Sequence, residues 1–549
     1  MKNLKKLFAV ILSLAMVLGM SITTFAAENV VGDKDDRGEI KVVNVDTDAK
    51  SVKAYPIIKA TYKSDSNDAV FTGYEVNYTT TPAITVNEDG EFTLSQDQIA
   101  QIRAKLKTDE AIDMTKAADD TTYTASVPVG AYLVIVEGSE TSTYNAMVVS
   151  VNYKNENGQN AIDLSKATAT AKKSTTPVLD KNIVEGTHTT KGNSVNIGDT
   201  VNYAVTVANI PEYTGKYPVF NVKDTLSAGL TYNEDLKVTV GNKTLASTDY
   251  TLTVNNQEIT VDFVVNDAYK LNDYKGETLT ISYSATVNEN AMLNEVGNNN
   301  DAKLTYSKDS SVANNKGEEE EKTYTYTFDL DGDINGETGS TYVDVLHLIN
   351  KIGEETKTIT TEGETKTVKA ALEGAEFTVY TDAECTTVYK NTIKPTGYVV
   401  RSNTAGQIEL KGLAAGTYYI KETKAPSGYS LNATPIKVEI VATYYTAQDA
   451  ANNENVDEGM LKAWSVKIND AEVASFTMTN DGGTTRWTRT DIIQKDGTTE
   501  YDKGFDILNT KLSSLPSTGG IGTTIFTIAG CVIMIVAAGL FFASRKKRA

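Results

Sequence analysis

The 549-residue sequence contains few of the side chains that build metal centres, disulfide frameworks and nucleophilic active sites. It has two cysteines, Cys385 and Cys531, and two histidines, His188 and His347. A site of several histidine or cysteine metal ligands and a disulfide framework both need more of these residues. A cysteine–histidine hydrolase would depend on Cys385, and no Ser/His/Asp or paired-carboxylate arrangement can be assembled. We therefore expect neither an enzyme nor a cofactor.

Basic side chains are in the minority. The chain has 52 Lys and Arg against 72 Asp and Glu, so its formal net charge is −20. A nucleic-acid-binding chain needs a dominant basic surface, so nucleic acid is not an expected partner. The apolar fraction of 40% is too high for a disordered chain. At roughly 150 residues per domain, the length predicts three or four domains.

The two ends of the chain carry export and membrane signals. Residues 1–27 combine early lysines, a short apolar run and small residues near position 27, which is the pattern of a secretory signal peptide. An N-terminal membrane helix is the alternative, but the apolar run is too short to span a bilayer. Residues 521–543 are apolar and long enough for a membrane helix, and the basic cluster 545–548 follows them. We expect an exported chain with a C-terminal membrane segment.

A short motif lies directly before this apolar segment. It consists of Leu515, Pro516, Ser517, Thr518 and Gly519. An LPxTG motif, a hydrophobic helix and a positive tail, in this order, resemble the cell-wall sorting signal of Gram-positive surface proteins. The resemblance implies that a sortase cysteine cuts between Thr518 and Gly519 and holds Thr518 as a thioester.

Between the two ends the sequence favours β-structure. Tyr, Thr and Val are abundant, with 29 tyrosines, and alternating segments such as 278–287 are separated by Asn, Gly and Asp turns. We expect an all-β chain of tandem immunoglobulin-like sandwiches, with 96–107 as the best helix. Residues 308–322 are expected to be a solvated acidic linker. The predicted divisions are the signal peptide 1–27, three domains over 28–170, 171–315 and 316–513, and a sorting segment over 514–549.

Two segments of the third domain resemble Cna-B-type domains of sortase-assembled pilins and adhesins. Residues 372–380 resemble the LxGAxF strand, and residues 412–429 resemble the E-box pattern YxxxETxAPxGY. Strand alternation turns Glu422 toward the core with Tyr418 and Ile420. A core-facing carboxylate without a partner is costly, so this acid needs a role.

The family resemblance implies that role. In such domains a lysine on the first strand and an asparagine on the last are joined by a spontaneous amide bond that a buried acid promotes. Lys351, Asn509 and Glu422 match these positions. The gap from Glu422 to Asn509 is longer than the family pattern, so we expect an insertion within 442–502 and keep Asn480 as a competing acceptor. The alternative is an ordinary ion pair between Lys351 and Glu422.

The second domain resembles the other Cna-like variant. Residues 220–232 resemble its DTLxxGLTY segment, and residues 300–306 resemble its closing strand. The resemblance implies a bond between Lys181 and Asn300, with Asp224 as the promoting acid. The alternative is that Asp224 and Asn300 are ordinary turn residues. The position of the acceptor asparagine is uncertain by one or two residues, and its alternatives are Asn298 and Asn299.

The first domain is expected to be a Cna-B-like sandwich. Residues 130–137 resemble the E-box strand, but no matching lysine and asparagine partners are present, so we predict no cross-link in this domain.

A pilus shaft also needs a lysine that resolves the Thr518 acyl-enzyme. In the major pilins that this chain resembles, it lies in a YPK motif at the junction of the first two domains. Lys172 and Lys173 occupy that position here, without the Tyr-Pro. We favour Lys172, followed by Lys173 and Lys166; an ordinary solvated lysine is the alternative.

An acidic stretch resembles the first half of a calcium loop. Position twelve, counted from Asp331, is Tyr342 in place of Glu, so an acidic turn is favoured over a calcium site. The candidate ligands are Asp329, Asp331, Asp333 and Asn335.

Taken together, these features resemble the major backbone pilin of a Gram-positive sortase-assembled pilus. The resemblance implies a structural, secreted and wall-anchored protein. Its expected partners are a pilin-specific sortase, identical subunits, minor pilins, peptidoglycan and host receptors. The alternative is a monomeric wall-anchored or pilus-tip adhesin that binds a host glycan or matrix protein.

Overall fold

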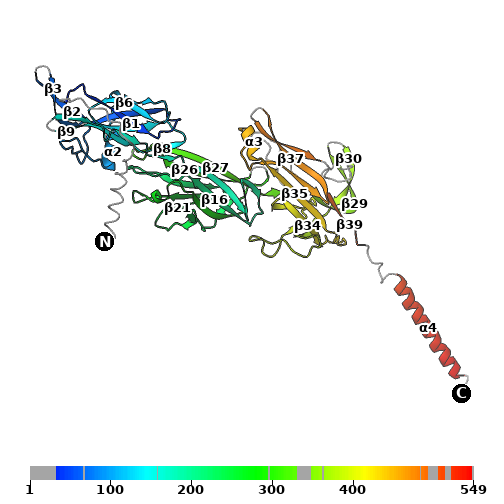
Figure 1. Ribbon diagram of the computed structural model, residues 1–549. Helices are drawn as coiled ribbons and strands as arrows, with labels where there is room; N and C mark the ends of the chain where they lie inside the picture. The colour runs from blue at the N-terminus through cyan, green and yellow to red at the C-terminus, as the bar shows by residue number, and fades with distance from the viewer. Residues whose placement is uncertain are drawn as a thin grey trace. The chain divides into compact units, whose positions relative to one another are not determined.

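The computed structural model describes residues 32–546, except 66–67, 157–158, 295–296, 331–347, 362–363, 482–483, 492–504 and 513–520. Strands dominate this part of the chain and helices are few, so the all-β prediction is confirmed (Figure 1). The chain forms two compact units. The first unit consists of Met1–Met292, Gly297–Tyr326 and Tyr445–Met460, and the second consists of Leu293–Val296, Thr327–Tyr444 and Leu461–Ala549.

The first domain lies in the first unit and contains two main sheets. Their strand orders are β11-β1-β6-β5 and β10-β9-β7-β2-β3, with β4 paired to β2. All residues of β7 except Glu137 are buried, because this central strand is covered on both faces. The elements are β1 (Arg37–Val43), β2 (Ser51–Asp65), β3 (Asp68–Val76), α2 (Gln96–Arg103), η1 (Thr108–Glu110), β4 (Ile112–Asp113), β5 (Thr115–Lys116), β6 (Tyr123–Pro128), β7 (Gly130–Glu137), β8 (Ser142–Tyr144), β9 (Met147–Glu156), β10 (Gln159–Asp163), β11 (Thr168–Thr170) and β12 (Lys173–Thr175).

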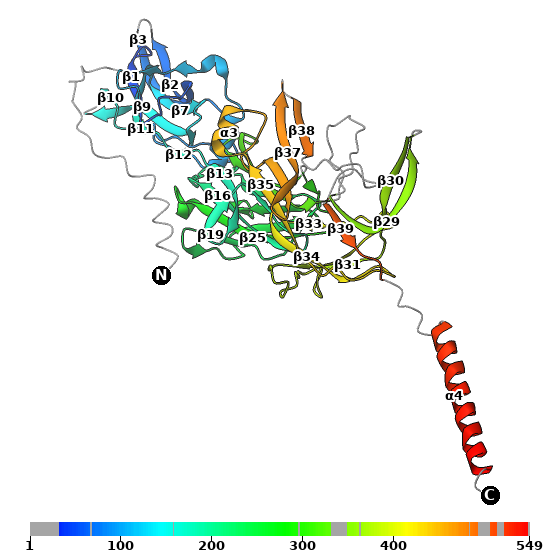
Figure 2. The same ribbon diagram turned by 90° about the vertical axis from the view of Figure 1, so that its right-hand side faces the viewer.

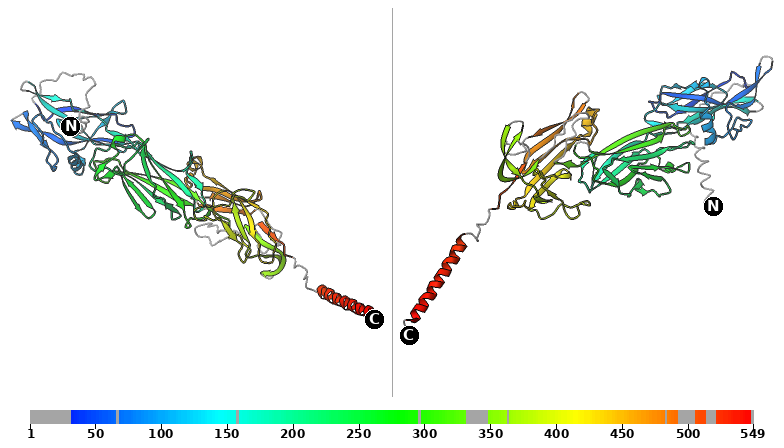
Figure 3. Two further views of the ribbon diagram at one scale, coloured as in Figure 1. Left: turned by 90° about the horizontal axis from the view of Figure 1, so that it is seen from below. Right: turned by 180° about the vertical axis from the view of Figure 1, so that it is seen from behind.

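The second domain also lies in the first unit and is a sandwich of two larger sheets. One sheet has the order β14-β13-β16-β25-β19-β20, with β18 beside β25, and the other has the order β15-β27-β26-β17-β22-β21. Figure 3 shows the strands of this domain, in cyan and green, from two further sides. Alternate residues of β16, β25 and β26 are buried in one apolar core between them. The elements are β13 (Val178–Glu185), β14 (His188–Thr190), β15 (Gly192–Ser194), β16 (Thr200–Ala208), β17 (Phe220–Leu226), β18 (Leu230–Tyr232), β19 (Lys237–Val240), β20 (Lys243–Thr244), β21 (Thr251–Asn255), β22 (Glu258–Asp262), β23 (Val264–Val265), β24 (Ala268–Tyr269), η2 (Asn272–Tyr274), β25 (Leu279–Val287), β26 (Asn298–Ser307) and β27 (Lys316–Tyr326).

The second, acidic part of the predicted linker 308–322 is a strand, because β27 begins at Lys316. β27 pairs antiparallel with the whole of β26, from Asn298↔Thr325 to Ser307↔Lys316. Glu318 and Glu320 lie on its exposed face and both pair with Lys303 of β26. The linker prediction is wrong because a row of solvated charges on one face of a strand has the same local composition as a loop. The second sandwich therefore extends beyond the predicted boundary at residue 315.

The third domain lies in the second unit. Its large sheet has the order β32-β31-β34-β35-β36-β37-β38, and a smaller sheet has the order β30-β29-β39. Within 442–502 the strands β36, β37 and β38 extend the large sheet, and Figure 2 shows the β37–β38 hairpin beside them. The elements are β28 (Phe328–Asp329), β29 (Ile349–Thr361), β30 (Glu364–Ala371), β31 (Glu376–Tyr380), β32 (Val399–Arg401), β33 (Lys411–Leu413), β34 (Gly416–Lys424), β35 (Ile436–Tyr444), α3 (Ala447–Asn452, grouped with the first unit), β36 (Leu461–Ile468), β37 (Ala471–Asp481), β38 (Thr484–Asp491) and β39 (Phe505–Asn509).

The last element is the apolar helix α4 (Ile521–Lys546). Within it, Ile525–Ser544 has a mean hydropathy of 2.6 and is long and apolar enough to cross a membrane. This agrees with the membrane segment predicted from the sequence.

Candidate functional site

Three predicted residues of the third domain meet in its core. Lys351 lies on β29, Glu422 on β34 and Asn509 on β39, and β29 and β39 are parallel neighbours. The Nζ atom of Lys351 donates a hydrogen bond to Oδ1 of Asn509 at 2.5 Å, and Nδ2 of Asn509 donates to Oε1 of Glu422 at 2.8 Å. The other carboxylate oxygen, Oε2, lies 3.6 Å from Nζ of Lys351. One carboxylate therefore contacts both the amine and the amide nitrogen.

This third-domain set is sealed from solvent. The exposed fractions of Lys351, Glu422 and Asn509 are 0%, 1% and 1%. Burial lowers the pKa of Lys351 to about 8, although Glu422 opposes the shift. The backbone N–H of Asn432 donates to Oε2 of Glu422 at 2.8 Å, a contact that the motif does not reveal. Burial thus favours the neutral amine, which is the nucleophilic form of lysine.

The competing acceptor Asn480 lies on β37, opposite Thr485 of β38. Its side chain is outside the described part of the structure. Among the described side chains, Asn509 is the asparagine that hydrogen-bonds to Lys351.

The second domain brings its predicted residues together across the sandwich. Lys181 lies on β13 in one sheet, while Asp224 on β17 and Asn300 on β26 lie in the other. Nζ of Lys181 contacts Oδ2 of Asp224 at 2.5 Å. The exposed fractions of Lys181, Asp224 and Asn300 are 0%, 3% and 0%. Burial lowers the pKa of Lys181 and raises the pKa of Asp224, so both shifts favour the neutral pair.

The neighbouring asparagines have other contacts. Oδ1 of Asn298 accepts the backbone N–H of Met292 at 2.8 Å, and Nδ2 of Asn298 donates to the carbonyl of Met292 at 3.0 Å. Asn299 is exposed and hydrogen-bonds to Asp301. Asn300 is the one of the three that shares a described hydrogen-bond partner with Lys181, because both side chains donate to the hydroxyl of Tyr283.

Sequence reasoning missed a tyrosine in this second site. The hydroxyl of Tyr283 on β25 accepts hydrogen bonds from Nζ of Lys181 at 3.2 Å and from Nδ2 of Asn300 at 2.7 Å. Its ring stacks on Tyr203 with centroids 5.3 Å apart. The alternation of β25 could have indicated that Tyr283 faces inward with Ile281, but it could not indicate what lies opposite.

Lys181 and Lys351 are the two buried lysines among the described residues. In the described part of the first domain no lysine is buried, and Glu137, at the end of the strand that echoes the E-box, is exposed. The absence of a cross-link in the first domain stays a prediction.

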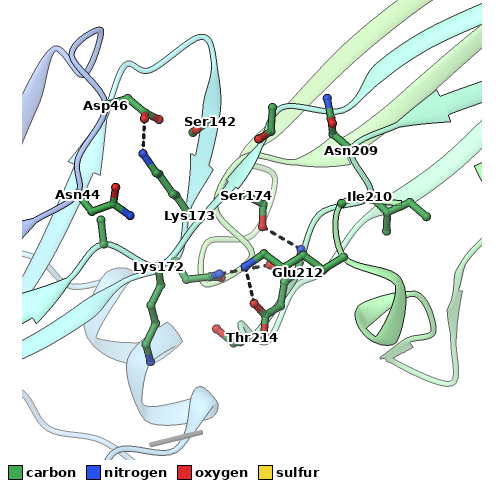
Figure 4. Close-up of a pocket in the computed structure, with 15 residues that line it drawn as sticks. Asn44, Asp46, Ser142, Lys172, Lys173, Ser174, Asn209, Ile210, Glu212 and Thr214 are labelled. Atoms are coloured by element: carbon green, nitrogen blue, oxygen red, sulfur yellow. Dashed lines mark hydrogen bonds and ion pairs between the residues drawn. The ribbon is translucent and has the colours of Figure 1, made fainter. Parts of the chain in front are cut away.

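The lysines proposed for polymerisation line a pocket of about 600 Å³ within the first unit (Figure 4). The ammonium of Lys173 is directed at Asp46 and forms an ion pair with it, whereas Lys172 is exposed and points elsewhere. Tyr144 donates to the other oxygen of Asp46 at 2.9 Å. Burial raises the pKa of Asp46, but the hydrogen bonds from Lys173, Ser142 and Tyr144 outweigh it and the net shift is downward.

Lys166, the third candidate, is exposed and pairs with Glu91 at 3.0 Å. It is not among the residues that line the pocket. The structure therefore groups Lys172 and Lys173 and separates Lys166 from them.

Two groups of predicted residues lie wholly or mainly outside the described residues. Leu515, Pro516, Ser517, Thr518 and Gly519 of the sorting motif are outside them. The same holds for the calcium candidates Asp331, Asp333 and Asn335, while Asp329 is buried on β28. Within the described ranges no group of three or more His, Cys, Asp or Glu side chains is arranged to hold a metal ion.

Three segments match known protein families. Residues 197–310 match the Cna-B-like domain of Gram-positive pilin backbone subunit 2. Residues 357–455 match the SpaA prealbumin-like fold domain, and residues 507–549 match the LPXTG cell wall anchor motif. These matches and the apolar helix indicate a cell-wall-anchored surface protein that is held in the membrane before sortase cleavage.

The chain is also similar to one curated protein along nearly its whole length. It is 24% identical over 578 residues to the trypsin-resistant surface T6 protein of Streptococcus pyogenes serotype M6, covering 98% of this chain and 99% of that protein. The solved T6 backbone pilin of serotype M6 S. pyogenes is 21% identical, with a TM-score of 0.50, and the match covers 87% of this chain and 99% of that one. The full-length major pilin SpaD of Corynebacterium diphtheriae is 15% identical with a TM-score of 0.43, over 88% of this chain and 99% of that one. The predicted resemblance to Gram-positive backbone pilins with an LPXTG anchor is confirmed, and the comparisons point to structural proteins.

Proposed function

We propose that this chain is the repeating structural subunit of a cell-surface pilus shaft and that it stabilises itself with two internal amide bonds. The observation that supports the proposal most strongly is that a lysine, an asparagine and an acid meet in a dry core in two successive domains. Similarity to a backbone pilin along nearly the whole chain supports the pilus assignment. No activity on an external substrate is part of the proposal.

The third-domain geometry supports a self-contained reaction. The neutral amine of Lys351 attacks Cγ of Asn509, so that the Nζ–Cγ bond forms and the Cγ–Nδ2 bond breaks. Glu422 takes a proton from Nζ and delivers a proton to Nδ2, which leaves as ammonia. The carboxylate is placed for both transfers because its two oxygens face the two nitrogens, at 3.6 and 2.8 Å. Proximity and exclusion of water replace the work of a separate enzyme.

The positions of the two bonds account for mechanical strength. A Lys351–Asn509 bond joins β29, near the start of the third domain, to its last strand, β39. A Lys181–Asn300 bond joins β13, the first strand of the second domain, to β26 in the opposite sheet. Tension applied to the ends of either domain then passes through covalent bonds, and the strands between them bear little load.

Polymerisation joins the subunits head to tail. Sortase would cleave after Thr518 and transfer its acyl group to a lysine of the next subunit, and the final transfer would go to peptidoglycan. The pocket that contains Lys172 and Lys173 is proposed as the acceptor site because it presents two lysines at the junction predicted for the nucleophile. Minor pilins and host receptors remain expected partners, and a monomeric wall-anchored or tip adhesin remains the second candidate.

The decisive experiment has two measurements. The intact mass of residues 28–514, produced without sortase, should be lower than the sequence mass by two ammonia molecules. Incubation of the precursor with a pilin-specific sortase should then give a covalent ladder, which is lost when Lys172 and Lys173 are both replaced by Ala. The single Lys172→Ala and Lys173→Ala variants identify the nucleophile, and Lys166→Ala is the matched control. A full sequence mass together with no ladder would refute the pilus-subunit proposal in favour of a simple anchored protein.

A further inference from the structure

The two proposed cross-linking sites differ in how the acid reaches the asparagine. In the third domain Glu422 contacts the amine of Lys351 and the amide nitrogen of Asn509. In the second domain Asp224 accepts a hydrogen bond from Lys181 and lies beside the hydroxyl of Tyr283, and among the described side chains no hydrogen bond joins Asp224 to Asn300. Aspartate has one methylene fewer than glutamate. The second domain therefore needs another group to carry a proton to the leaving nitrogen.

Tyr283 occupies that place. Its hydroxyl oxygen accepts from Nζ of Lys181 at 3.2 Å and from Nδ2 of Asn300 at 2.7 Å, so it bridges the nitrogen that must lose a proton and the nitrogen that must gain one. Among the described side chains, it is the one that hydrogen-bonds to both of these nitrogens. Its exposed fraction is 4%, so bulk water does not compete for the transfer.

We infer that Tyr283 is a catalytic residue of the second-domain cross-link and relays a proton from Lys181 to Asn300. This inference rests on the proposed self-formed amide bond. As the Nζ–Cγ bond forms, Nζ gives a proton to the phenol oxygen, and the phenol gives its own proton to Nδ2. The Cγ–Nδ2 bond breaks, ammonia leaves, and Tyr283 ends with one proton as it began.

The stacked tyrosine provides a matched control. Tyr203 shares the same core and stacks on Tyr283; its hydroxyl lies beside Thr325 and Asn300, whereas the described hydrogen bond from Nζ of Lys181 to a tyrosine goes to Tyr283. Replacing either tyrosine with Phe keeps the ring and removes one buried hydroxyl. A purely structural role of these hydroxyls would affect the two variants similarly.

The test follows ammonia loss by intact mass after residues 28–518 are refolded from inclusion bodies. Tyr283→Phe should slow loss of the second-domain ammonia by on the order of 100-fold, the usual contribution of a positioned proton donor. Tyr203→Phe should react at close to the wild-type rate. The third-domain ammonia should be lost at the wild-type rate in both variants, because the third domain lies in the other compact unit and its site is unchanged.

The possible outcomes separate the relay from the bond itself. Equal rates for Tyr283→Phe and Tyr203→Phe would overturn the relay and leave the amide bond standing. A wild-type chain that never loses the second-domain ammonia would refute the bond, and the relay with it. If Tyr283→Phe fails to fold, a straight dependence of the wild-type rate on deuterium content in mixtures of H₂O and D₂O would overturn the relay, because a two-proton relay gives a curved one.

Discussion

The replacement Asn509→Ala tests the third-domain bond most directly. It removes the acceptor and leaves Lys351 and Glu422 3.6 Å apart as an ion pair. Lys351 and Asn509 are 158 positions apart, and a cross-link over such a loop removes chain entropy worth about 5 kcal/mol from the unfolded state.

The assay combines intact mass with scanning calorimetry. Relative to its own sequence mass, Asn509→Ala should lack one ammonia, whereas the wild type should lack two. The unfolding temperature of a domain of this size falls by roughly 2–4 °C for each kcal/mol of stability lost. The third-domain unfolding temperature should therefore fall by roughly 10–20 °C. The unfolding temperature of the second domain should not change, because the substitution does not alter the cross-linking site of that domain.

Asn350→Ala is the control for this experiment. Asn350 is a buried asparagine next to Lys351 on β29, and it donates a long hydrogen bond of 3.4 Å to Asp506. Its removal should cost about 1–2 kcal/mol and leave the mass deficit intact. The reasoning fails if Asn509→Ala loses as much ammonia as the wild type, or if it is no less stable than Asn350→Ala.

Three further predictions concern charge and burial. Glu422→Gln and Asp224→Asn should each abolish the loss of one ammonia in their own domain, and a variant that still shows both losses would remove these acids from the mechanism. In the Asn509→Ala chain, the pKa of Lys351 is about 8 when folded and about 10.4 when unfolded, so the unfolded state binds the extra proton between these values. Urea unfolding of this variant should therefore show stability rising by about 3 kcal/mol from pH 8 to above pH 10, while the cross-linked wild type, which has no free amine there, should not show this rise. Arg103→Ala breaks the 2.5 Å pair with Asp309, whose side chains are 7% and 11% exposed, and should cost about 3–5 kcal/mol in thermal unfolding. Lys216→Ala, which breaks the exposed pair with Asp97, should leave thermal unfolding nearly unchanged, and equal losses in the two variants would contradict this account.

The resemblance to backbone pilins could be predicted from the sequence because the motifs that carry it are local. The sorting motif, the apolar segment and the E-box are contiguous patterns, and strand alternation alone placed Glu422 and Asn300 on inward faces. Motif matching then paired Lys351 with Asn509, two residues that the structure brings into hydrogen-bond contact. These inferences needed no knowledge of which strands face each other.

Only the tertiary structure decided the contacts across each sandwich. Alternation tells which face a side chain occupies, but the residue opposite it depends on how two sheets stack, and that stacking is set by the whole core. For this reason Tyr283 was missed, although the strand that carries it was recognised. The choice of Asn300 over Asn298, the ion pair of Lys173 with Asp46 and the strand formed by the acidic stretch 316–326 all depend on register between segments far apart in the chain. The sequence by itself determined the kind of chemistry this protein carries, and the packing of distant strands decided which atoms are close enough to perform it.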